Sequence, residues 1–223
     1  MIVYSEEVHA ELSARHYLYE LFHILLGNAP TEELLQAIDG KIVQESFFIS
    51  TAKDSEDAEV GQFFSRIEGF KDVSLEALQS DYAVVFEGPE SLPAPPWESV
   101  YTSNKRLLFQ KSTLEIRNIY RSQGLLPSLY PRVADDHISL ELDYLSHLAQ
   151  RSLEAFVAQD EESYAQAMAA NKAFLVDHLG VWVGSFADDL AKWKSDSFYT
   201  YAAKTLEVFI RNEITNLEVI CAE

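Results

Sequence analysis

Four of the chain's seven prolines fall within eight residues, and this cluster divides the sequence into two helical parts. A helical pattern runs up to Phe86, and Gly88-Pro89 ends it, because proline lacks the backbone donor and clashes with the preceding turn. The fixed φ angles of a proline-rich segment lower the entropy cost of ordering it. Trp97 and Tyr101 follow directly, and these large side chains with one polar edge each suit a ligand-binding surface. The alternative is a connector whose tryptophan fills the core. The clustered prolines are Pro89, Pro93, Pro95 and Pro96.

The remaining sequence predicts an all-α protein of about nine or ten helices. No stretch shows sustained alternation of period two, and the chain contains only eight glycines. Residues 41–53 are apolar with interspersed Ser and Thr, and they receive no assignment. The predicted helices are 5–27 with Ser5 as cap and Gly27 as end, 30–40, 55–68, 74–86, 113–123 closed by Gly124, about 136–158 capped by Asp135, 161–179, 181 to about 194, and 196 to about 216 capped by Ser195.

Two proline-containing connectors organise these helices. The first spans 88–112, between an N-terminal part of about 1–88 and a C-terminal bundle of about 113–223; the second is a loop at 125–134. Neither connector is long enough to separate independent domains. We therefore expect one globular unit over 1–223, with its functional surface where the two connectors meet.

The charge of the chain restricts its partners. Thirty-six acidic against 17 basic residues give a formal charge of −19, which disfavours nucleic acid and acidic membrane surfaces and attracts a basic peptide. A single cysteine, Cys221, excludes an internal disulfide, as is typical of a reducing compartment. The first residues resemble no secretory signal, and no apolar run is long enough to span a membrane. We expect a cytoplasmic protein.

The sequence carries no common catalytic motif. It lacks a Walker glycine loop, a dinucleotide fingerprint, GxSxG and CxxC. Glu-x-x-His, a di-metal ligand pattern, occurs as Glu6/His9 and Glu20/His23, but the two copies lie on one helix and about 21 Å apart. A polar helix face explains them better, so we expect no catalytic residue, no metal and no cofactor.

A second cluster begins the helix near residue 136. Asp136 and His137 are followed by Glu141, one turn after His137 on the same face, while Asp143 and His147 occupy the adjacent face. Carboxylates bind guanidinium groups in bidentate geometry, and an aromatic ring accepts the flat face of an arginine. The cluster therefore suits an arginine-binding site. The alternative is structural, with an acid at the helix start and His137 paired with Glu141.

Both segments resemble signatures of the TorD/DmsD family, the cytoplasmic chaperones of molybdenum-containing reductases that are exported by the twin-arginine route. The resemblance is strong from about residue 78 to 148. Asp81 stands where Glu is common, and Val85 where Leu is common. The first signature is matched by Asp81, Tyr82, Val85, Phe86, Gly88, Pro89, Pro96 and Trp97, and the second by Asp136, His137, Glu141, Leu142, Tyr144 and Leu145.

The resemblance implies a TorD-like helical bundle that binds the twin-arginine leader, and the precursor that carries it, of a dimethyl sulfoxide or trimethylamine N-oxide type reductase. The chaperone would hold the leader until the molybdenum cofactor is inserted, as a monomer or a domain-swapped dimer. Guanine nucleotides have been linked to the family, but this chain has no phosphate-cradling motif. A helical metalloenzyme with a carboxylate and histidine site is the alternative. The expected peptide-binding residues are Pro96, Trp97, Ser99, Tyr101, Asp136, His137 and Glu141.

Overall fold

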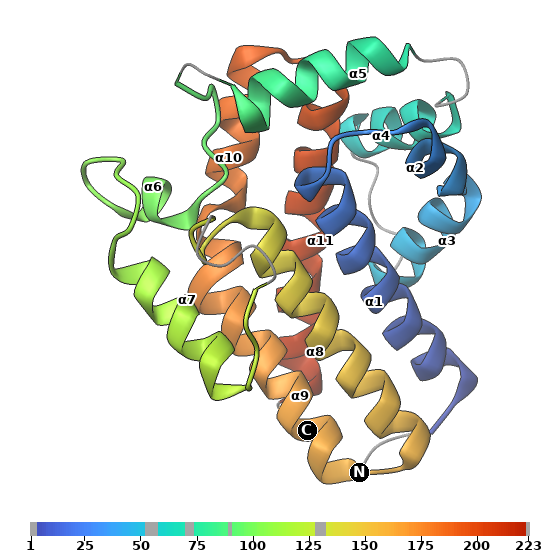
Figure 1. The fold of residues 1–223 in the computed structure, drawn as a ribbon. Coiled ribbons are helices and arrows are strands. Elements are labelled where there is room, and N and C mark those ends of the chain that lie inside the picture. Colours follow the sequence, from blue (N-terminus) through green and yellow to red (C-terminus); the bar gives the residue numbers. More distant parts are fainter. Residues whose placement is uncertain (1–3, 52–57, 70–73, 89–90, 128–132, 222–223) are drawn as a thin grey trace.

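The computed structural model describes residues 4–51, 58–69, 74–88, 91–127 and 133–221 (Figure 1). Every regular element in these ranges is helical, which confirms the all-α prediction, and the single β-type contact in them is an isolated bridge. The helices are α1 (Glu6–Gly27), α2 (Glu32–Ala37), α3 (Gly40–Ser50), α4 (Ala58–Glu68), α5 (Leu75–Tyr82), α6 (Glu98–Thr102), α7 (Lys111–Ser122), α8 (Ile138–Ala158), α9 (Glu161–Phe174), α10 (Gly180–Trp193) and α11 (Phe198–Ile220), with π-helical segments η2 (Ala83–Glu87) and η3 (Leu175–Leu179).

The N-terminal helices begin at short polar caps. The Ser5 hydroxyl accepts a hydrogen bond from the backbone N–H of Val8, so α1 starts where the sequence predicts. Thr31 caps α2 and Asp39 caps α3 in the same way. The unassigned region 41–53 is helical as far as Ser50, and Gly40, which was expected to end a helix, instead begins α3.

The helix that leads into the proline cluster ends in a π turn. Ser74 caps α5, and η2 continues the same helix to Glu87, one residue before Gly88. Pro89 lies outside the described residues, as do 55–57 of the predicted 55–68 helix and 128–132 of the predicted loop. Gly124, with φ of +73°, closes the region after α7 as predicted.

The expected start of the long helix α8 is wrong by two residues. Asp135 does not cap it; His137 does, because its Nδ1 accepts a hydrogen bond from the backbone N–H of Ser139. The Asp135 side chain instead binds Arg117 of α7, with Nη2 to Oδ2 at 2.6 Å.

The expected helix break at Gly180 is also wrong. Residues 161–193 form one continuous rod in which η3 joins α9 to α10. A Cβ at position 180 would lie 2.5 Å from the carbonyl oxygen of Leu175 and 2.7 Å from Cδ1 of Ile214. Glycine is therefore required there by the Leu175 carbonyl that the π turn brings close, and Ile214 of α11 packs against the same point. With the rod counted once, the described residues hold ten helices, within the predicted nine or ten.

The last helix starts later than predicted. Ser197, and not Ser195, caps α11, since its hydroxyl accepts from the backbone N–H of Tyr199. Lys194 to Ser197 form a turn, although the sequence predicts that Asp196 and Ser197 belong to the last helix. α11 then runs to Ile220, beyond the predicted end at about 216.

One core joins both halves of the chain. α1 packs along α8, α4 packs along α11, and α10 packs along α11, as the interleaved colours of Figure 1 show. Phe22 of α1 stacks between Phe63 of α4 and Phe209 of α11, with ring centroids 5.8 and 6.2 Å apart. None of the helices in the described ranges is long and apolar enough to cross a membrane. The division of the chain near 88 and 112 stays a prediction.

Candidate functional site

The two signature segments meet at a bridge between Trp97 and His137. Their backbones form an isolated antiparallel bridge, and the N–H of Ile138 donates to the carbonyl of Pro96 at 2.9 Å. The indole and imidazole rings are perpendicular, with centroids 5.2 Å apart. Both side chains are half-buried. The structure therefore brings together residues that lie forty positions apart, at the point where the two connectors meet.

Asp136 is fully buried beneath this bridge. Its Oδ2 accepts a hydrogen bond from the backbone N–H of Ser99 at 2.8 Å, and its carbonyl accepts from the N–H of Glu98 at 3.0 Å. Because Trp97 supplies no side-chain cap, this carboxylate caps α6 from outside. The other oxygen, Oδ1, has no hydrogen-bond partner among the described residues. In this conformation the Asp136 carboxylate does not reach the surface.

His137 is neutral at physiological pH. Burial lowers its pKa to about 4, and the nearby His23 of α1 acts in the same direction. Nδ1 accepts from the backbone N–H of Ser139 at 3.2 Å, which leaves the ring proton on Nε2. The alternative pairing of His137 with Glu141 is not present.

Glu141 lies in a buried polar cluster under α6. Its Oε2 accepts from Nε1 of Trp182 at 3.2 Å, and burial next to Glu98 raises its pKa well above the usual value. Glu98 itself contacts Nδ1 of His178 in η3 at 3.0 Å. The sequence analysis missed Glu98, His178 and Trp182. Only the position of Glu98, directly after Trp97, could have suggested one of them.

Tyr101 and Ser99 complete the inner face of α6. The Tyr101 ring stacks on Trp182 with centroids 5.4 Å apart and planes at 22°, and burial raises the pKa of its hydroxyl. On its other side the Arg106 guanidinium lies 4.9 Å from the ring centroid. Ser99 is fully buried, and its Oγ has no partner in the described part of the chain. α6 is thus fixed to the bundle by polar and aromatic contacts together.

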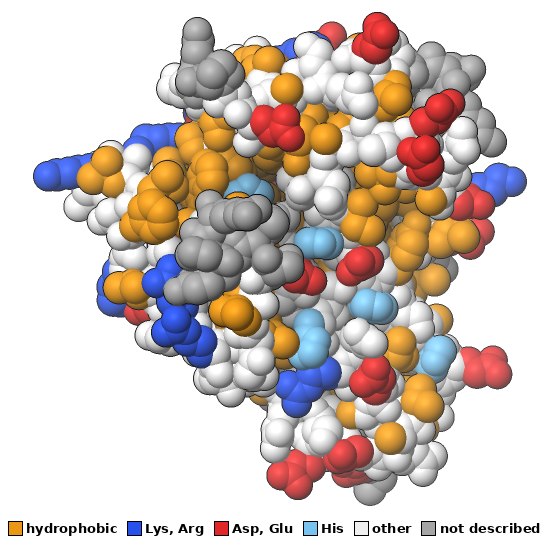
Figure 2. All heavy atoms as spheres, in the orientation of Figure 1, with side chains coloured by type: hydrophobic (Ala, Val, Ile, Leu, Met, Phe, Trp, Pro, Cys, Tyr) orange, Lys and Arg blue, Asp and Glu red, His pale blue; other side chains and the backbone are white. Residues whose placement is uncertain are grey.

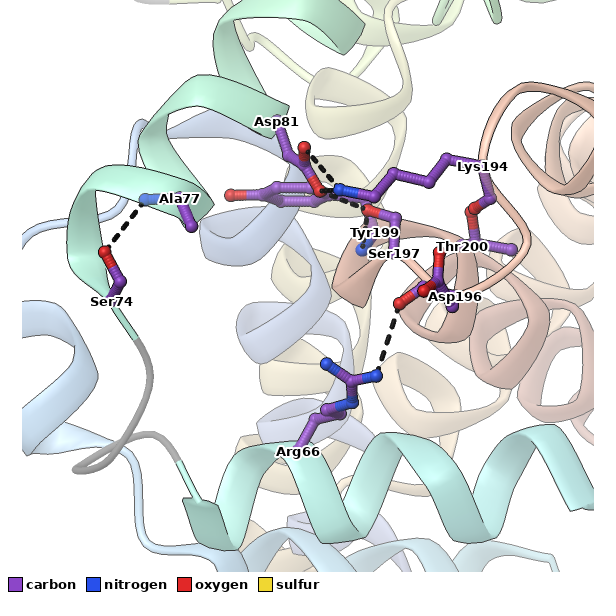
Figure 3. Close-up of polar contacts among 9 residues, drawn as sticks. All are labelled: Arg66, Ser74, Ala77, Asp81, Lys194, Asp196, Ser197, Tyr199 and Thr200. Carbon is purple, nitrogen blue, oxygen red and sulfur yellow. Dashed lines mark hydrogen bonds and ion pairs between the residues drawn. The ribbon is translucent and has the colours of Figure 1, made fainter.

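The first residues of the first signature, Asp81 to Phe86, lie away from the Trp97–His137 bridge and connect helices. Asp81 accepts from Nζ of Lys194 at 2.8 Å and from the hydroxyl of Ser197 at 2.9 Å, so it ties α5 to the turn before α11 (Figure 3). Tyr82 and Phe86 pack edge-on against Tyr199, with centroids 5.7 and 5.6 Å away. The structure does not bring Asp81, Tyr82 or Phe86 to the Trp97–His137 bridge.

A groove of about 240 Å³ lies between α7 and α8, on the outer side of the same helix start. Its walls are largely apolar and aromatic, with the exposed carboxylate of Asp143 and the half-buried His147 as polar groups. The sequence analysis noted Asp143 and His147 but did not predict the groove, because its other wall comes from the loop after α7. The lining residues are Tyr120, Leu125, Leu126, Pro127, Leu140, Asp143, Tyr144 and His147.

The α1 histidines contact α8 and are not arranged as metal ligands. Nδ1 of His23 lies 2.8 Å from the carbonyl oxygen of Ser139, and Glu20 accepts from the hydroxyl of Ser146 at 3.0 Å. Figure 2 shows histidine and acidic side chains along the middle of the face of the molecule that it presents. Within the described ranges, no group of three or more His, Cys, Asp or Glu side chains is placed to hold a metal ion.

Comparison with known proteins places these features in a family. Residues 52–188 match the family model described as nitrate reductase delta subunit. The chain is 28% identical to the chaperone protein TorD of Vibrio cholerae (serotype O1, El Tor) over 149 residues, which cover 67% of this chain and 66% of that protein. It therefore spans about two thirds of the length of that relative.

Two further relatives agree. TorD of Photobacterium profundum is 27% identical over 192 residues, which cover 85% of this chain and 77% of that protein. The probable Tat proofreading chaperone DmsD of Haemophilus influenzae is 27% identical over 134 residues, which cover 58% of this chain and 59% of that protein. A solved candidate redox enzyme maturation protein of Archaeoglobus fulgidus aligns with a TM-score of 0.49 at 21% identity, over 88% of this chain and 93% of that one. The matched family model and these relatives together show that the chain belongs to the TorD/DmsD family.

Proposed function

We propose that this protein is a maturation chaperone that binds the twin-arginine leader of a molybdenum-cofactor reductase precursor of the dimethyl sulfoxide or trimethylamine N-oxide type. The observation that carries the proposal is the meeting of both signature segments at the Trp97–His137 bridge, beside the groove between α7 and α8. The names of the relatives, which are chaperones, support the same function and do not favour a metalloenzyme. The protein acts by binding, without a chemical step, and in the cytoplasm.

The leader has two chemical parts, and the surface offers a place for each. An apolar stretch fits the walls of the groove and the exposed side of Trp97. An arginine needs a carboxylate that it can reach, and Asp143 at the groove is exposed while Asp136 is buried. A guanidinium on a carboxylate forms charge-assisted hydrogen bonds, and the charge of −19 favours the approach of a basic segment.

The buried members of the predicted site have a positioning role in this proposal. The bond between Asp136 and Ser99 fixes the start of α6 next to the start of α8, and Glu141 joins α8 to α10 through Trp182, on which Tyr101 of α6 stacks. These contacts position Trp97 relative to His137. A rigid surface binds a peptide with less loss of entropy than a mobile one. Direct contact of Asp136 with an arginine stays a prediction that requires α6 to move.

Titration with synthetic leader peptides tests the proposal. We expect a leader with paired arginines to bind, and a scrambled peptide of equal charge to bind more weakly. Affinity should fall but persist as salt rises, since exposed charges are screened over about 10 Å at 0.1 M ionic strength. Asp143→Asn and Trp97→Ala should weaken binding, whereas Asp177→Asn, at an exposed acid of η3, serves as the matched control. Equal affinity for the leader and the scrambled peptide would refute specific recognition.

A further inference from the structure

The loop between α6 and α7 exposes an apolar tip. Residues Asn104 to Phe109 are all exposed, and the tip contains three consecutive large apolar side chains. Leu107 is 49% exposed and Phe109 68%, while Leu114 on the first turn of α7 is 56% exposed. Single exposed apolar side chains are ordinary on a soluble protein, but a contiguous group of them marks an interaction surface. We call residues 104–111 together with Leu114 the α6–α7 tip.

The backbone of this tip is held in a defined shape. The Ser103 hydroxyl accepts from the N–H of Leu107 at 3.1 Å, and Nε2 of Gln110 donates to the carbonyl of Leu108 at 2.8 Å. Arg106 and Phe109 both have left-handed backbone, with φ of 51° and 57°, which is costly for side chains of this size. These bonds thus keep Leu107 and Phe109 exposed instead of allowing the loop to fold back.

One ion pair anchors the tip to the bundle. Nη2 of Arg106 donates to Oδ2 of Asp189 in α10 at 2.7 Å, and its guanidinium covers the Tyr101 ring. Tyr101 belongs to α6, which is five residues long, or about 7.5 Å. The tip therefore lies only one short helix away from Trp97.

The tip and the α7 helix that follows it form the basic part of an acidic protein. Residues 103–123 hold five basic residues and one acidic residue, a net charge of +4, so the other 202 residues carry −23. Figure 2 shows basic and apolar side chains together at the left edge of the molecule, over the loop next to α6 in Figure 1. The basic residues are Lys105, Arg106, Lys111, Arg117 and Arg121, and the acidic one is Glu115.

This chemistry selects a partner different from the leader. An apolar centre surrounded by cations is complementary to an apolar depression surrounded by carboxylates. A leader with paired arginines is repelled by the tip and attracted by the rest of the chain. An anionic bilayer extends beyond the tip and would meet the −23 of the remaining surface, whereas a small protein surface contacts the tip alone. The observations favour a protein surface.

We propose that the α6–α7 tip docks on an acidic, apolar surface of the precursor outside its leader; this inference rests on the proposed function. A leader bound at Trp97 holds the rest of the precursor close to the tip. Tethering raises the effective concentration of a second contact, so a small patch that binds weakly alone adds more affinity in the complete precursor. The tip then binds an acidic surface of the precursor, while the leader site binds the basic leader of the same precursor.

Four binding measurements test this inference, each with the full chain. The probes are the leader peptide, the complete precursor, the precursor without its leader, and vesicles of phosphatidylglycerol and phosphatidylcholine in equal parts. The test variants are Leu107→Ser/Phe109→Ser and Lys105→Glu/Lys111→Glu. The matched controls are Val157→Ser, at a similarly exposed apolar residue of α8, and Lys41→Glu on α3. Thermal unfolding of each variant verifies its fold.

We expect both tip variants to weaken binding of the complete precursor by about tenfold or more and to abolish binding of the leaderless precursor, without weakening binding of the leader peptide. The controls should behave as wild type. The inference is wrong if the tip variants bind the complete precursor like the controls, or if the tip is required for vesicles and not for the leaderless precursor. Failure of the wild-type chain to bind the leader peptide would instead overturn the proposed function, and the inference with it.

Discussion

The carboxylate of Asp136 caps a helix to which it does not belong: its Oδ2 accepts the backbone N–H of Ser99 at 2.8 Å, and Ser99 lies in the first turn of α6. Both residues are fully buried. Because this bond spans the two signature segments, the folding of one depends on the other. It also explains why an acid suits position 136 without requiring that it contact a ligand.

Replacement of Asp136 should therefore change stability. Asp136→Ala leaves the buried N–H of Ser99 without an acceptor, and we expect a loss of about 1–3 kcal/mol in the free energy of unfolding. Asp136→Asn keeps an acceptor oxygen and should lose less. Urea unfolding of both variants measures this, with leader titration alongside. Unchanged stability together with lost leader affinity would show that Asp136 acts on the ligand directly.

Glu141 makes stability depend on pH in one direction. The unfolded chain releases its proton near the usual pKa of 4.5, while the folded chain keeps it to higher pH because burial beside Glu98 raises the pKa. The folded state then binds more protons above pH 4.5, so this group lowers stability as pH rises through that window. Glu141→Gln removes the effect and retains an acceptor for Trp182. We expect the stability of the variant relative to wild type to increase as pH rises above 4.5 in urea titrations. A difference that does not change with pH would contradict this.

His137 makes stability depend on pH in the opposite direction. Its pKa in the folded chain is about 4, against a usual 6.5, so between these values the unfolded chain binds a proton that the folded chain does not. Stability from this group is lost as pH falls through that window. His137→Gln should reduce the loss between pH 6.5 and 4, which is measured as the difference between variant and wild-type unfolding free energies at each pH. A difference that does not vary with pH would show that the imidazole does not titrate in this way.

A buried ion pair far from the site provides a test of the core. Nε of Arg15 in α1 donates to Oε2 of Glu213 in α11, and both side chains are buried. Removing one partner leaves an uncompensated charge, so Arg15→Met or Glu213→Gln should each cost about 3–5 kcal/mol. The double replacement Arg15→Met/Glu213→Leu should restore much of the loss. A double-mutant cycle in urea measures the coupling, and additive losses would contradict it.

Most of the fold followed from local sequence signals. Ser5 and Gly124 are local signals that mark a helix start and a helix end, and the structure agrees with both. The role of Gly180 could not be predicted, because glycine is required there by the Leu175 carbonyl oxygen of a π turn and by Ile214 of a helix more than thirty residues later. The true cap at His137 was missed because the acid expected at that helix start is bound by Arg117 of another helix. The cap at Ser197 lies two residues after the expected Ser195.

The sequence allowed the residues of the candidate site to be predicted, but not their burial or their contacts. The two signatures indicated that Trp97 and His137 belong together, and the structure brings their rings within 5.2 Å. Burial of Asp136 and Glu141 could not be predicted, since it depends on Ser99 and Trp182, whose distance from them in space is set by tertiary packing. Whether these residues bind a peptide stays a prediction.

The π-helical segment η3 has a consequence for the evolution of this chain. A π turn amounts to one residue inserted into an α-helix, and each residue of an α-helix advances the side chains by about 100°. Deleting one residue within 175–179 would therefore rotate all of α10 by about a quarter turn relative to α9, and carry Trp182 and Phe186 away from the positions in which they are fully buried. Relatives without this turn would need a one-residue gap there and a different set of core residues in the helix that follows.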